Sequence, residues 1–254
     1  MISVVIVGTG NVAQNLFFAL EKASNVVIKQ IVGRNENHFS FTNGKVSTTT
    51  DYKQTVTADI YILAISDDSI SIVAQKLKHI KGIVVHTSGA TSITALNEYD
   101  QPGIFYPLQT FTKGKIISFA EIPICIEAKN TDELKLLRQL GNTLSNTVIV
   151  MDSEQRKKIH IAAVFVNNFT NYMYTIGKEI CDENNLDFKL LHPLIKETAA
   201  KLDDLTPLEA QTGPAKRGDQ NTLHNHLKLI KNNHQRELYT LLSNAIKEKH
   251  GKEL

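Results

Sequence analysis

The sequence has few cysteines, and the two that it has lie far apart. Cys125 and Cys181 are the only ones among 254 residues, and their spacing matches no metal-binding motif. A scaffold held together by disulfides is therefore excluded, and reduced cysteines predict a cytoplasmic protein. Because the first residues have the pattern of a core strand, we expect no cleaved leader peptide.

Long apolar runs and a strong charge of one sign are also missing. No run reaches the roughly 18 apolar residues of a membrane span, so we expect no membrane partner. The formal net charge is only +2, from 28 Lys and Arg against 26 Asp and Glu. These basic residues are scattered along the chain, which excludes the basic surface of a nucleic-acid-binding protein. No internal repeat or low-complexity linker is present.

The stretch that organises the chain lies at its N-terminus. An apolar, β-branched run at residues 2–7 leads into the motif GTGNVA at residues 8–13, and a helical pattern follows. Gly8 permits a tight turn, Gly10 lets the backbone approach a pyrophosphate, and Ala13 replaces the third glycine of the dinucleotide fingerprint. The alternative is a glycine-rich turn with a structural role only. The predicted cofactor contacts here are Gly8, Thr9, Gly10, Asn11 and Val12.

The end of the second predicted strand, residues 26–32, decides which dinucleotide we expect. An NAD site would place an acidic residue there to hold the ribose 2′-hydroxyl. The strand ends at Gly33 and Arg34 instead. A guanidinium suits a 2′-phosphate, and one charge-assisted hydrogen bond contributes about 1.5–3 kcal/mol. The sequence therefore predicts NADP, while the nearby Glu36, or an Arg34 that only faces solvent, keeps NAD as the alternative.

Further strands are predicted near residues 46–48, 60–65, 83–85, 103–105, 122–127 and 147–151, with helices between several of them. This alternation predicts an α/β fold with a Rossmann-type parallel sheet over residues 1–151. In such sheets ligands bind at the carboxyl ends of the strands. That rule adds Ile65, Ser66 and Ser88 as cofactor contacts, Ser88 also as a catalytic candidate, and Tyr106 and Gln109 as substrate contacts.

After Asp152 the strand patterns stop and helical patterns fill the chain to its end. They predict a smaller all-helical domain over residues 152–254 that binds substrate and forms a dimer. Its first helix is expected from residue 153 to about residue 184, with an apolar and therefore buried middle at residues 159–173. A domain of this size with such a helix has more apolar surface than its own core covers. We therefore expect a homodimer formed through residues 153–254.

Six motifs follow one another along the chain: GTGNVA, VGR, HTSGA, YPLQTF, HIAAVFVNNF and QTGPAKRGD. In this order they resemble, over nearly the whole chain, the Rossmann-like proteins with a C-terminal helical domain of unknown function, number twenty-five-twenty in the usual naming. More distantly, the layout is similar to pyrroline-5-carboxylate reductase, ketopantoate reductase and the 6-phosphogluconate dehydrogenase group. The resemblance implies an NAD(P)-dependent oxidoreductase. It also implies that the helical domain shapes the substrate site.

One departure from these relatives concerns catalysis. Hydroxyacid dehydrogenases of this layout carry a catalytic lysine in the first interdomain helix, with an asparagine four residues on. Here Lys157 and Lys158 are followed at that spacing by Ile161 and Ala162. The catalytic role of that lysine is therefore not carried over to Lys157 or Lys158.

Polar residues inside the long apolar helix supply the candidates. His160 and Asn167 are seven positions apart and share a helix face, from which Asn168 is turned by one residue. Asn168 is the asparagine that fits the family pattern. A histidine with an asparagine beside a nicotinamide can orient a carbonyl and deliver a proton. His160 and Asn168 are therefore the predicted catalytic residues, and the alternative is a structural polar network.

Other polar clusters are weaker candidates. No G-x-S-x-G elbow surrounds Ser88, which argues against a hydrolase. His224, His226 and His234 are spaced poorly for one metal ion, so we expect no metal. Arg217 follows a Gly-Pro turn and is predicted to bind an anionic group of a small-molecule substrate. A structural ion pair with Asp219 is the alternative.

The leading functional hypothesis is hydride transfer between NADP and a small substrate with a C=O or C=N bond. The cofactor would supply the difficult chemistry, and the protein its placement. The alternative is a non-catalytic protein that binds or senses NADP(H), because no complete catalytic pair is visible in the sequence.

Overall fold

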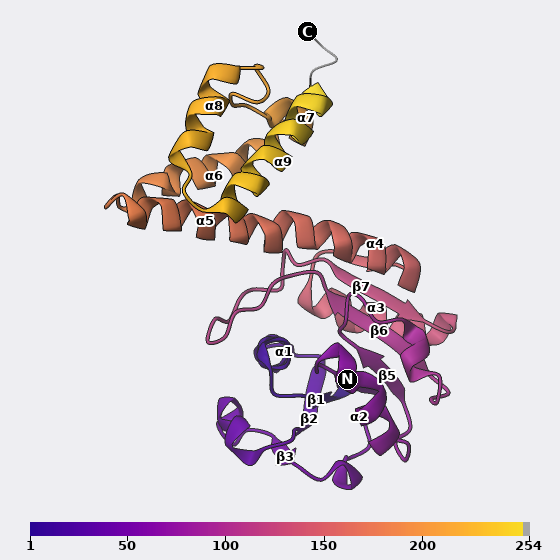
Figure 1. Cartoon of the computed structure of the whole chain (residues 1–254). Coiled ribbons are helices and arrows are strands. Elements are labelled where there is room, and N and C mark those ends of the chain that lie inside the picture. Colours follow the sequence, from indigo (N-terminus) through magenta and orange to yellow (C-terminus); the bar gives the residue numbers. More distant parts are fainter. Residues whose placement is uncertain (251–254) are drawn as a thin grey trace. The chain divides into compact units, whose positions relative to one another are not determined.

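The computed structural model describes residues 1–250 (Figure 1). Its contacts divide the chain into two compact units, the first being Met1–Asn168 and the second beginning at Phe169. The first unit contains strands and helices, and the second is built from helices in the part that the structure describes. The predicted fold class, a Rossmann-type α/β sheet followed by a helical region, is confirmed.

The first unit is organised around one sheet of eight strands within residues 1–168. Its strands are β1 (Ile2–Val7), β2 (Val26–Val32), β3 (Ser47–Thr49), β4 (Ile60–Leu63), β5 (Ile83–His86), β6 (Pro102–Pro107), β7 (Ile124–Ala128) and β8 (Val148–Val150). Across the sheet they run in the order β3-β2-β1-β4-β5-β6-β7-β8. The winding direction reverses between β1 and β4, and ligands of open α/β sheets bind at such a reversal.

One strand pair differs from the predicted parallel arrangement. β6 and β7 pair antiparallel, with Phe105 opposite Ile126, whereas the other neighbouring strands are parallel. The reason lies in the connection, because residues 108–123 contain no helix. Parallel neighbours need a long crossover, usually helical. An antiparallel pair near the edge of a parallel sheet is common in this fold class.

Helices cover both faces of the sheet. The helices of the first unit are α1 (Asn11–Glu21), α2 (Ile70–Lys76), α3 (Thr131–Leu144) and α4 (Ser153–Ala163). The first strand shows the division, because its consecutive side chains point to opposite faces. Val4 and Ile6 pack in one core with α1 and α3, while Val5 and Val7 pack in another with α2. A strand buried on both faces explains the continuous apolar run at residues 2–7.

A capping box begins α4. Asp152 accepts a hydrogen bond from the backbone N–H of Gln155, and the Gln155 side chain accepts one from the N–H of Asp152. This helix passes into a π-helical segment, Val164–Phe169, and then into α5 (Thr170–Glu183). The predicted burial of residues 159–173 is wrong for the single chain, because Ile161, Val166 and Tyr172 are 59%, 74% and 54% exposed.

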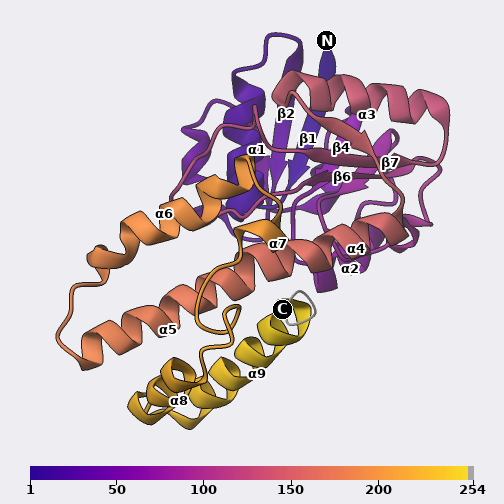
Figure 2. The same ribbon diagram turned by 90° about the horizontal axis from the view of Figure 1, so that it is seen from above.

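The second unit contains α5 and four further helices within its described residues (Figure 2). These are α6 (His192–Ala200), α7 (Pro207–Ala210), α8 (Gln220–Leu229) and α9 (Asn233–His250). Side chains link them, since Gln235 on α9 donates to Glu179 on α5 and His226 on α8 bonds to Tyr239 on α9. Across residues 1–250, no helix is both long enough and apolar enough to cross a membrane.

The change from strands to helices and the division by contacts fall at different places. β8 ends at Val150 and α4 begins at Ser153, on either side of the boundary predicted at residues 151 and 152. The contacts place Asn168 as the last residue of the first unit, so that α4 belongs with the sheet. This division matters for function, because α4 carries His160.

Candidate functional site

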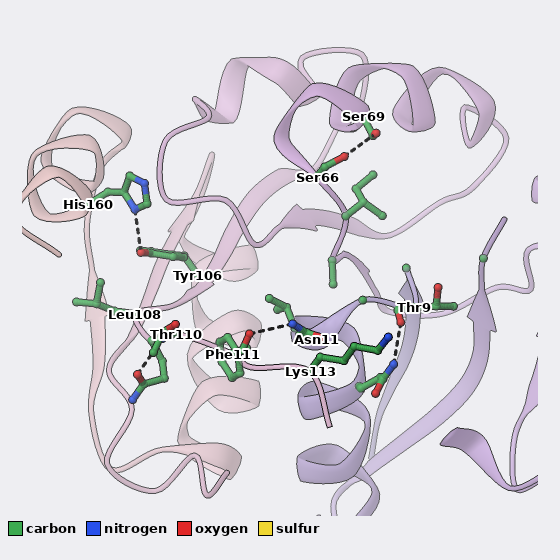
Figure 3. Close-up of a pocket in the computed structure, with 18 of the residues that line it drawn as sticks. Thr9, Asn11, Ser66, Ser69, Tyr106, Leu108, Thr110, Phe111, Lys113 and His160 are labelled. Atoms are coloured by element: carbon green, nitrogen blue, oxygen red, sulfur yellow. Dashed lines mark hydrogen bonds between the residues drawn. The ribbon is translucent and has the colours of Figure 1, made fainter. Parts of the chain in front are cut away.

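A cavity of about 1220 Å³ lies at the carboxyl ends of the central strands, and all of its lining residues fall within residues 8–168. Typical small-molecule pockets measure about 300–1,000 Å³, so this one has room for a large ligand. Figure 3 shows part of its lining. Most predicted site residues line it: Gly8, Thr9, Gly10, Asn11, Val12, Arg34, Ile65, Ser66, Tyr106, Gln109, His160 and Asn168.

One end of the cavity is formed by the turn between β1 and α1. Gly8 has a φ of +130°, and a Cβ there would lie 2.1 Å from the carbonyl oxygen of Ala64. The strand behind the turn therefore leaves room for glycine alone. At Gly10 the situation is the opposite, since a Cβ would meet nothing within 4 Å. The space beside Gly10 is the approach to the backbone that a pyrophosphate requires.

The N-terminus of α1 faces this end without a negative partner. Gly10 is its N-cap and supplies no side chain, and the first turn contains no acidic residue. The amide of Asn11 is already engaged, because its Nδ2 donates to the backbone oxygen of Phe111 at 2.9 Å. The free backbone N–H groups and the positive end of the helix dipole are together suited to binding an anion. The motif GTGNVA thus takes the conformation that a dinucleotide turn needs.

Beyond this turn the cavity continues along residues that follow β2. Arg34 lines it, and sequence reasoning missed the neighbouring lining residues Asn37, His38, Ser40 and Tyr52. Asn35 caps a short 3₁₀ turn by accepting from the N–H of Asn37, and this turn folds the segment back toward the cavity. An asparagine shortly after a strand is a turn signal, which could have predicted this turn from the sequence. Glu36, the residue that kept NAD open, does not line the cavity.

The opposite end carries a hydrogen-bonded pair of side chains. The hydroxyl oxygen of Tyr106, on β6, lies 3.2 Å from Nδ1 of His160, on α4, and the two rings meet edge to face. Figure 3 shows the two side chains pointing toward each other. The sequence predicted a substrate contact and a catalytic histidine, but it did not predict that the two are partners.

Burial makes the tyrosine a weaker acid than usual. It raises the pKa of Tyr106 to about 12, with the nearby Cys125 as a second cause. The protonated phenol can donate a hydrogen bond to Nδ1 of His160 when that nitrogen carries no proton. In that arrangement the imidazole carries its own proton on Nε2. Together the two groups can pass a proton to a reacting atom in the cavity.

Ser88 does not belong to the cavity lining. Its side chain is 6% exposed, and its hydroxyl donates to Thr91 and accepts from the backbone N–H groups of Ala90 and Thr91. The hydroxyl thereby holds its own loop together, and the structure gives no support to the predicted cofactor and catalytic contact. The physical reason is that a serine after a strand can close a local turn instead of facing the ligand.

The loop that contains Ser88 packs against the Tyr106–His160 pair. His86 is fully buried, and burial lowers its pKa to about 4, so it is neutral at neutral pH. Its Nδ1 accepts from the N–H of Ser88, and its Nε2 lies 3.3 Å from the oxygen of Ser92. Gly89 then packs directly against the pair: a Cβ there would lie 2.6 Å from Nδ1 of His160 and 2.8 Å from Tyr106.

A buried arginine fixes α4 to the same loop and to the sheet. Arg156, one turn before His160, is fully buried. Its guanidinium pairs with Glu127 and donates to the backbone oxygen of Thr91. Arginine offers several donors in a rigid plane, so one side chain can join elements that are far apart in sequence. The position of His160 is therefore set by contacts that the sequence pattern did not reveal.

The π-helical segment changes which asparagines share a face with His160. In a regular α-helix Asn167 would lie on the histidine's face and Asn168 would be turned away. A π turn takes in one extra residue, which rotates the following side chains back. Both Asn167 and Asn168 line the cavity together with His160.

One further predicted site residue belongs to the helical unit. Arg217 belongs to the second unit, in the turn after Gly213, and its role as an anion contact stays a prediction. Among residues 1–250 there is no group of three or more His, Cys, Asp or Glu side chains that could hold a metal ion.

Comparisons with known proteins concern the sequence and the fold of the chain. Residues 122–246 match the family described as a domain of unknown function, DUF2520. A crystal structure from Bacteroides fragilis, provisionally described as an NADP oxidoreductase, is 38% identical and has a TM-score of 0.90. That match covers 97% of this chain and 98% of the other. Among proteins with curated descriptions, none matches the sequence.

More distant structures share the fold. A pyrroline-5-carboxylate reductase from Coxiella burnetii is 17% identical with a TM-score of 0.59, over 99% of this chain and 98% of that one. An imine reductase from Myxococcus stipitatus, solved in complex with NADP⁺, is 14% identical with a TM-score of 0.65, over 97% and 92%. The predicted likeness to pyrroline-5-carboxylate reductase is thus confirmed at the level of fold.

Proposed function

The chain belongs to the DUF2520 family, and from that premise we propose that it is an NADP-dependent oxidoreductase acting on a small substrate with a C=O or C=N bond. One observation carries the proposal: a single cavity has a phosphate-binding turn at one end and the Tyr106–His160 pair at the other. The relatives described as NADP oxidoreductase and imine reductase support the same class of reaction.

The residues that line the cavity suit the phosphate groups of an NADP molecule. Gly8 and Gly10 provide the turn and the open approach for the pyrophosphate. Arg34 is the cation at the end of β2, where the 2′-phosphate of NADP would be bound, and Glu36 lies outside the lining. An acidic group is what an NAD site would require at this place. These features favour NADP over NAD.

The bound nicotinamide would supply a hydride to the substrate carbon. Side chains of the protein would orient the substrate and supply the proton. We assign the proton that reaches the substrate oxygen or nitrogen to the Tyr106–His160 pair, whose two members are 3.2 Å apart. Asn168 would orient the polar atom of the substrate by a hydrogen bond. Hydride and proton together reduce C=O to an alcohol or C=N to an amine, and the reverse reaction returns both.

Two variants test the proton-donor assignment. Tyr106→Phe and His160→Gln should each lower kcat by about 10²- to 10⁴-fold, the usual contribution of general acid catalysis. The Kd for NADPH should stay unchanged, because neither group lies at the phosphate end. His79→Gln is the matched control, since His79 is exposed and does not line the cavity. A full kcat in both variants would contradict the assignment.

Arg34→Ala tests the choice of cofactor. Loss of one charge-assisted hydrogen bond should reduce the preference for NADPH over NADH by about 10- to 150-fold, measured as the ratio of the two Kd values. Equal affinities in the wild-type protein, or an unchanged ratio in the variant, would contradict NADP as the cofactor.

A non-catalytic protein that binds NADP(H) is the second candidate. It is favoured by the position of the lysines, because neither Lys157 nor Lys158 lines the cavity, and Lys157 pairs with Glu154. The catalytic lysine of the hydroxyacid dehydrogenases thus has no equivalent here. Tight NADPH binding without oxidation of NADPH by any small aldehyde, ketone, keto acid or cyclic imine would favour this second function.

We also propose that the protein works as a homodimer formed through residues 153–254. Large apolar side chains are exposed in the helical unit of the single chain, among them Leu190 at 72%, Leu229 at 75% and Leu241 at 66%. Exposed apolar surface of this kind marks an interaction site. Light scattering at micromolar concentration should give twice the monomer mass, and a monomer would contradict the proposal.

A further inference from the structure

The connection between β6 and β7 lies across the start of α1. We call residues 108–119 the strap. Two asparagines of α1 hold it: Asn11 Nδ2 donates to the oxygen of Phe111 at 2.9 Å. Asn15 donates to the oxygen of Lys115 at 3.2 Å and accepts from the N–H of Ile117 at 3.0 Å. Asn15 is 1% exposed. A segment without regular secondary structure is thus fixed on both sides of its tip.

The tip of the strap carries a lysine at the phosphate end of the cavity. Lys113 lies between the two tied positions, and Gly114, with a φ of +75°, makes the turn that follows it. Lys113 lines the same cavity as Gly8, Gly10 and Arg34, whereas Lys115 does not. Figure 3 shows its side chain extending from the strap toward the loop that carries Thr9. The lysine comes from a segment about a hundred residues away from the glycine turn.

The charges at this place lack a negative partner. Within residues 1–250, no carboxylate forms an ion pair with Lys113. The first turn of α1 contains no acidic residue and has no side-chain cap. A lysine ammonium and the positive end of a helix therefore share one end of a cavity. A doubly charged anion placed between them would satisfy both.

We propose that Lys113 binds the pyrophosphate of the dinucleotide cofactor, and that the strap fixed by Asn11 and Asn15 exists to present it. This inference rests on the proposed function, because it takes the cavity to be a dinucleotide site. The inference assigns a different phosphate group of the cofactor to each of two cations. Lys113 contributes to NADP and NAD alike, because both carry the pyrophosphate, whereas Arg34 distinguishes them by the 2′-phosphate.

Binding measurements with matched lysine variants test the division. The Kd values for NADPH and for NADH are measured by fluorescence titration in wild type, Lys113→Gln, Lys113→Arg and Lys115→Gln. Lys113→Gln should weaken both cofactors by the same factor, about tenfold, the size of one charge-assisted contact. Lys113→Arg keeps the charge and should retain most of the affinity. Lys115→Gln makes the same charge change two residues away and should leave both Kd values nearly unchanged.

Each other result overturns a specific statement. Equal effects of Lys113→Gln and Lys115→Gln would mean that Lys113 acts only through the overall charge, and the inference would be wrong. Weakening of NADPH alone would place Lys113 at the 2′-phosphate and would overturn the pyrophosphate assignment. The expected Kd changes without any turnover would leave the inference standing and overturn the proposed reaction. A wild-type protein that binds neither dinucleotide would overturn both.

Discussion

The two ends of the cavity are built from different parts of the chain. At the proposed phosphate end, residues 8–12 offer their backbone groups, and the side chains of Arg34 and Lys113 line the same cavity. At the proton-donor end Tyr106 and His160 come from a strand and a helix, 54 positions apart, and only their side chains meet. The first end depends on a turn without side chains, with two cations beside it, and the second depends on the exact placement of two side chains.

This difference determines what each end can tolerate. The glycine turn fails when a new atom enters it, because the backbone behind it leaves no room. A side-chain site depends on whatever packs behind it, which here is the loop of residues 86–92 together with the buried Arg156. Substitutions far from the ligand should therefore affect the proton-donor end more than the phosphate end.

The largest effect is expected at Gly8, with Gly10 as its matched control. Gly8→Ala places a Cβ 2.1 Å from a backbone oxygen at a φ of +130°, and we expect a loss of about 4 kcal/mol or more in the free energy of unfolding. Gly10→Ala meets nothing within 4 Å, so it should fold normally and lose NADPH affinity. Urea unfolding and NADPH titration measure the two effects. A stable Gly8→Ala protein would contradict the close packing of this turn.

An intermediate effect is expected from the pH dependence of stability through His86. Burial lowers the pKa of His86 from 6.5 to about 4 in the folded protein. Above pH 6.5 the imidazole is neutral in both states, and its contribution is complete. As the pH falls from 6.5 to 4, only the unfolded chain gains the proton, so the free energy of unfolding decreases by up to about 3 kcal/mol. Below pH 4 this loss ends.

The variant His86→Asn isolates this contribution. Urea unfolding of wild type and variant is measured at several pH values between 4 and 7. The wild-type stability should fall more steeply toward acid, because only that protein has the buried imidazole. Parallel pH profiles would show that His86 is not held neutral, and the account of the loop behind the proton-donor end would be wrong.

The smallest effect is expected from Gly89→Ala, which separates the paired side chains. The new Cβ would lie 2.6 Å from Nδ1 of His160, and an imidazole can move aside at little cost to folding. We expect kcat to fall about tenfold, equivalent to about 1.4 kcal/mol, with NADPH affinity and stability nearly unchanged. In a His160→Ala background the same substitution should add little, because the ring that it displaces is gone. Additive effects would contradict direct contact.

Tyr106 and Ser88 show what a rule about strand ends can and cannot predict. Ser88 comes after β5 and Tyr106 lies near the end of β6, and the rule about carboxyl ends selected both. The rule states that ligands bind where strands end, but it does not state in which direction a side chain at that place extends. Tyr106 reaches the cavity, whereas the Ser88 hydroxyl closes a turn within its own loop. Local hydrogen bonds decided between them, and these depend on loop geometry.

The sequence by itself determined the Rossmann-type sheet, the glycine turn, the cation after β2 and the change to helices after residue 152. Each of these follows from neighbours in the chain, through apolar periodicity, the conformational freedom of glycine or a helix cap. Only the tertiary structure decided that Tyr106 meets His160, that a π turn brings Asn168 to the cavity and that the strap carries Lys113 to the glycine turn. These three contacts join positions far apart or depend on one extra residue in a helical turn. No local pattern encodes them, because their energies come from packing between elements.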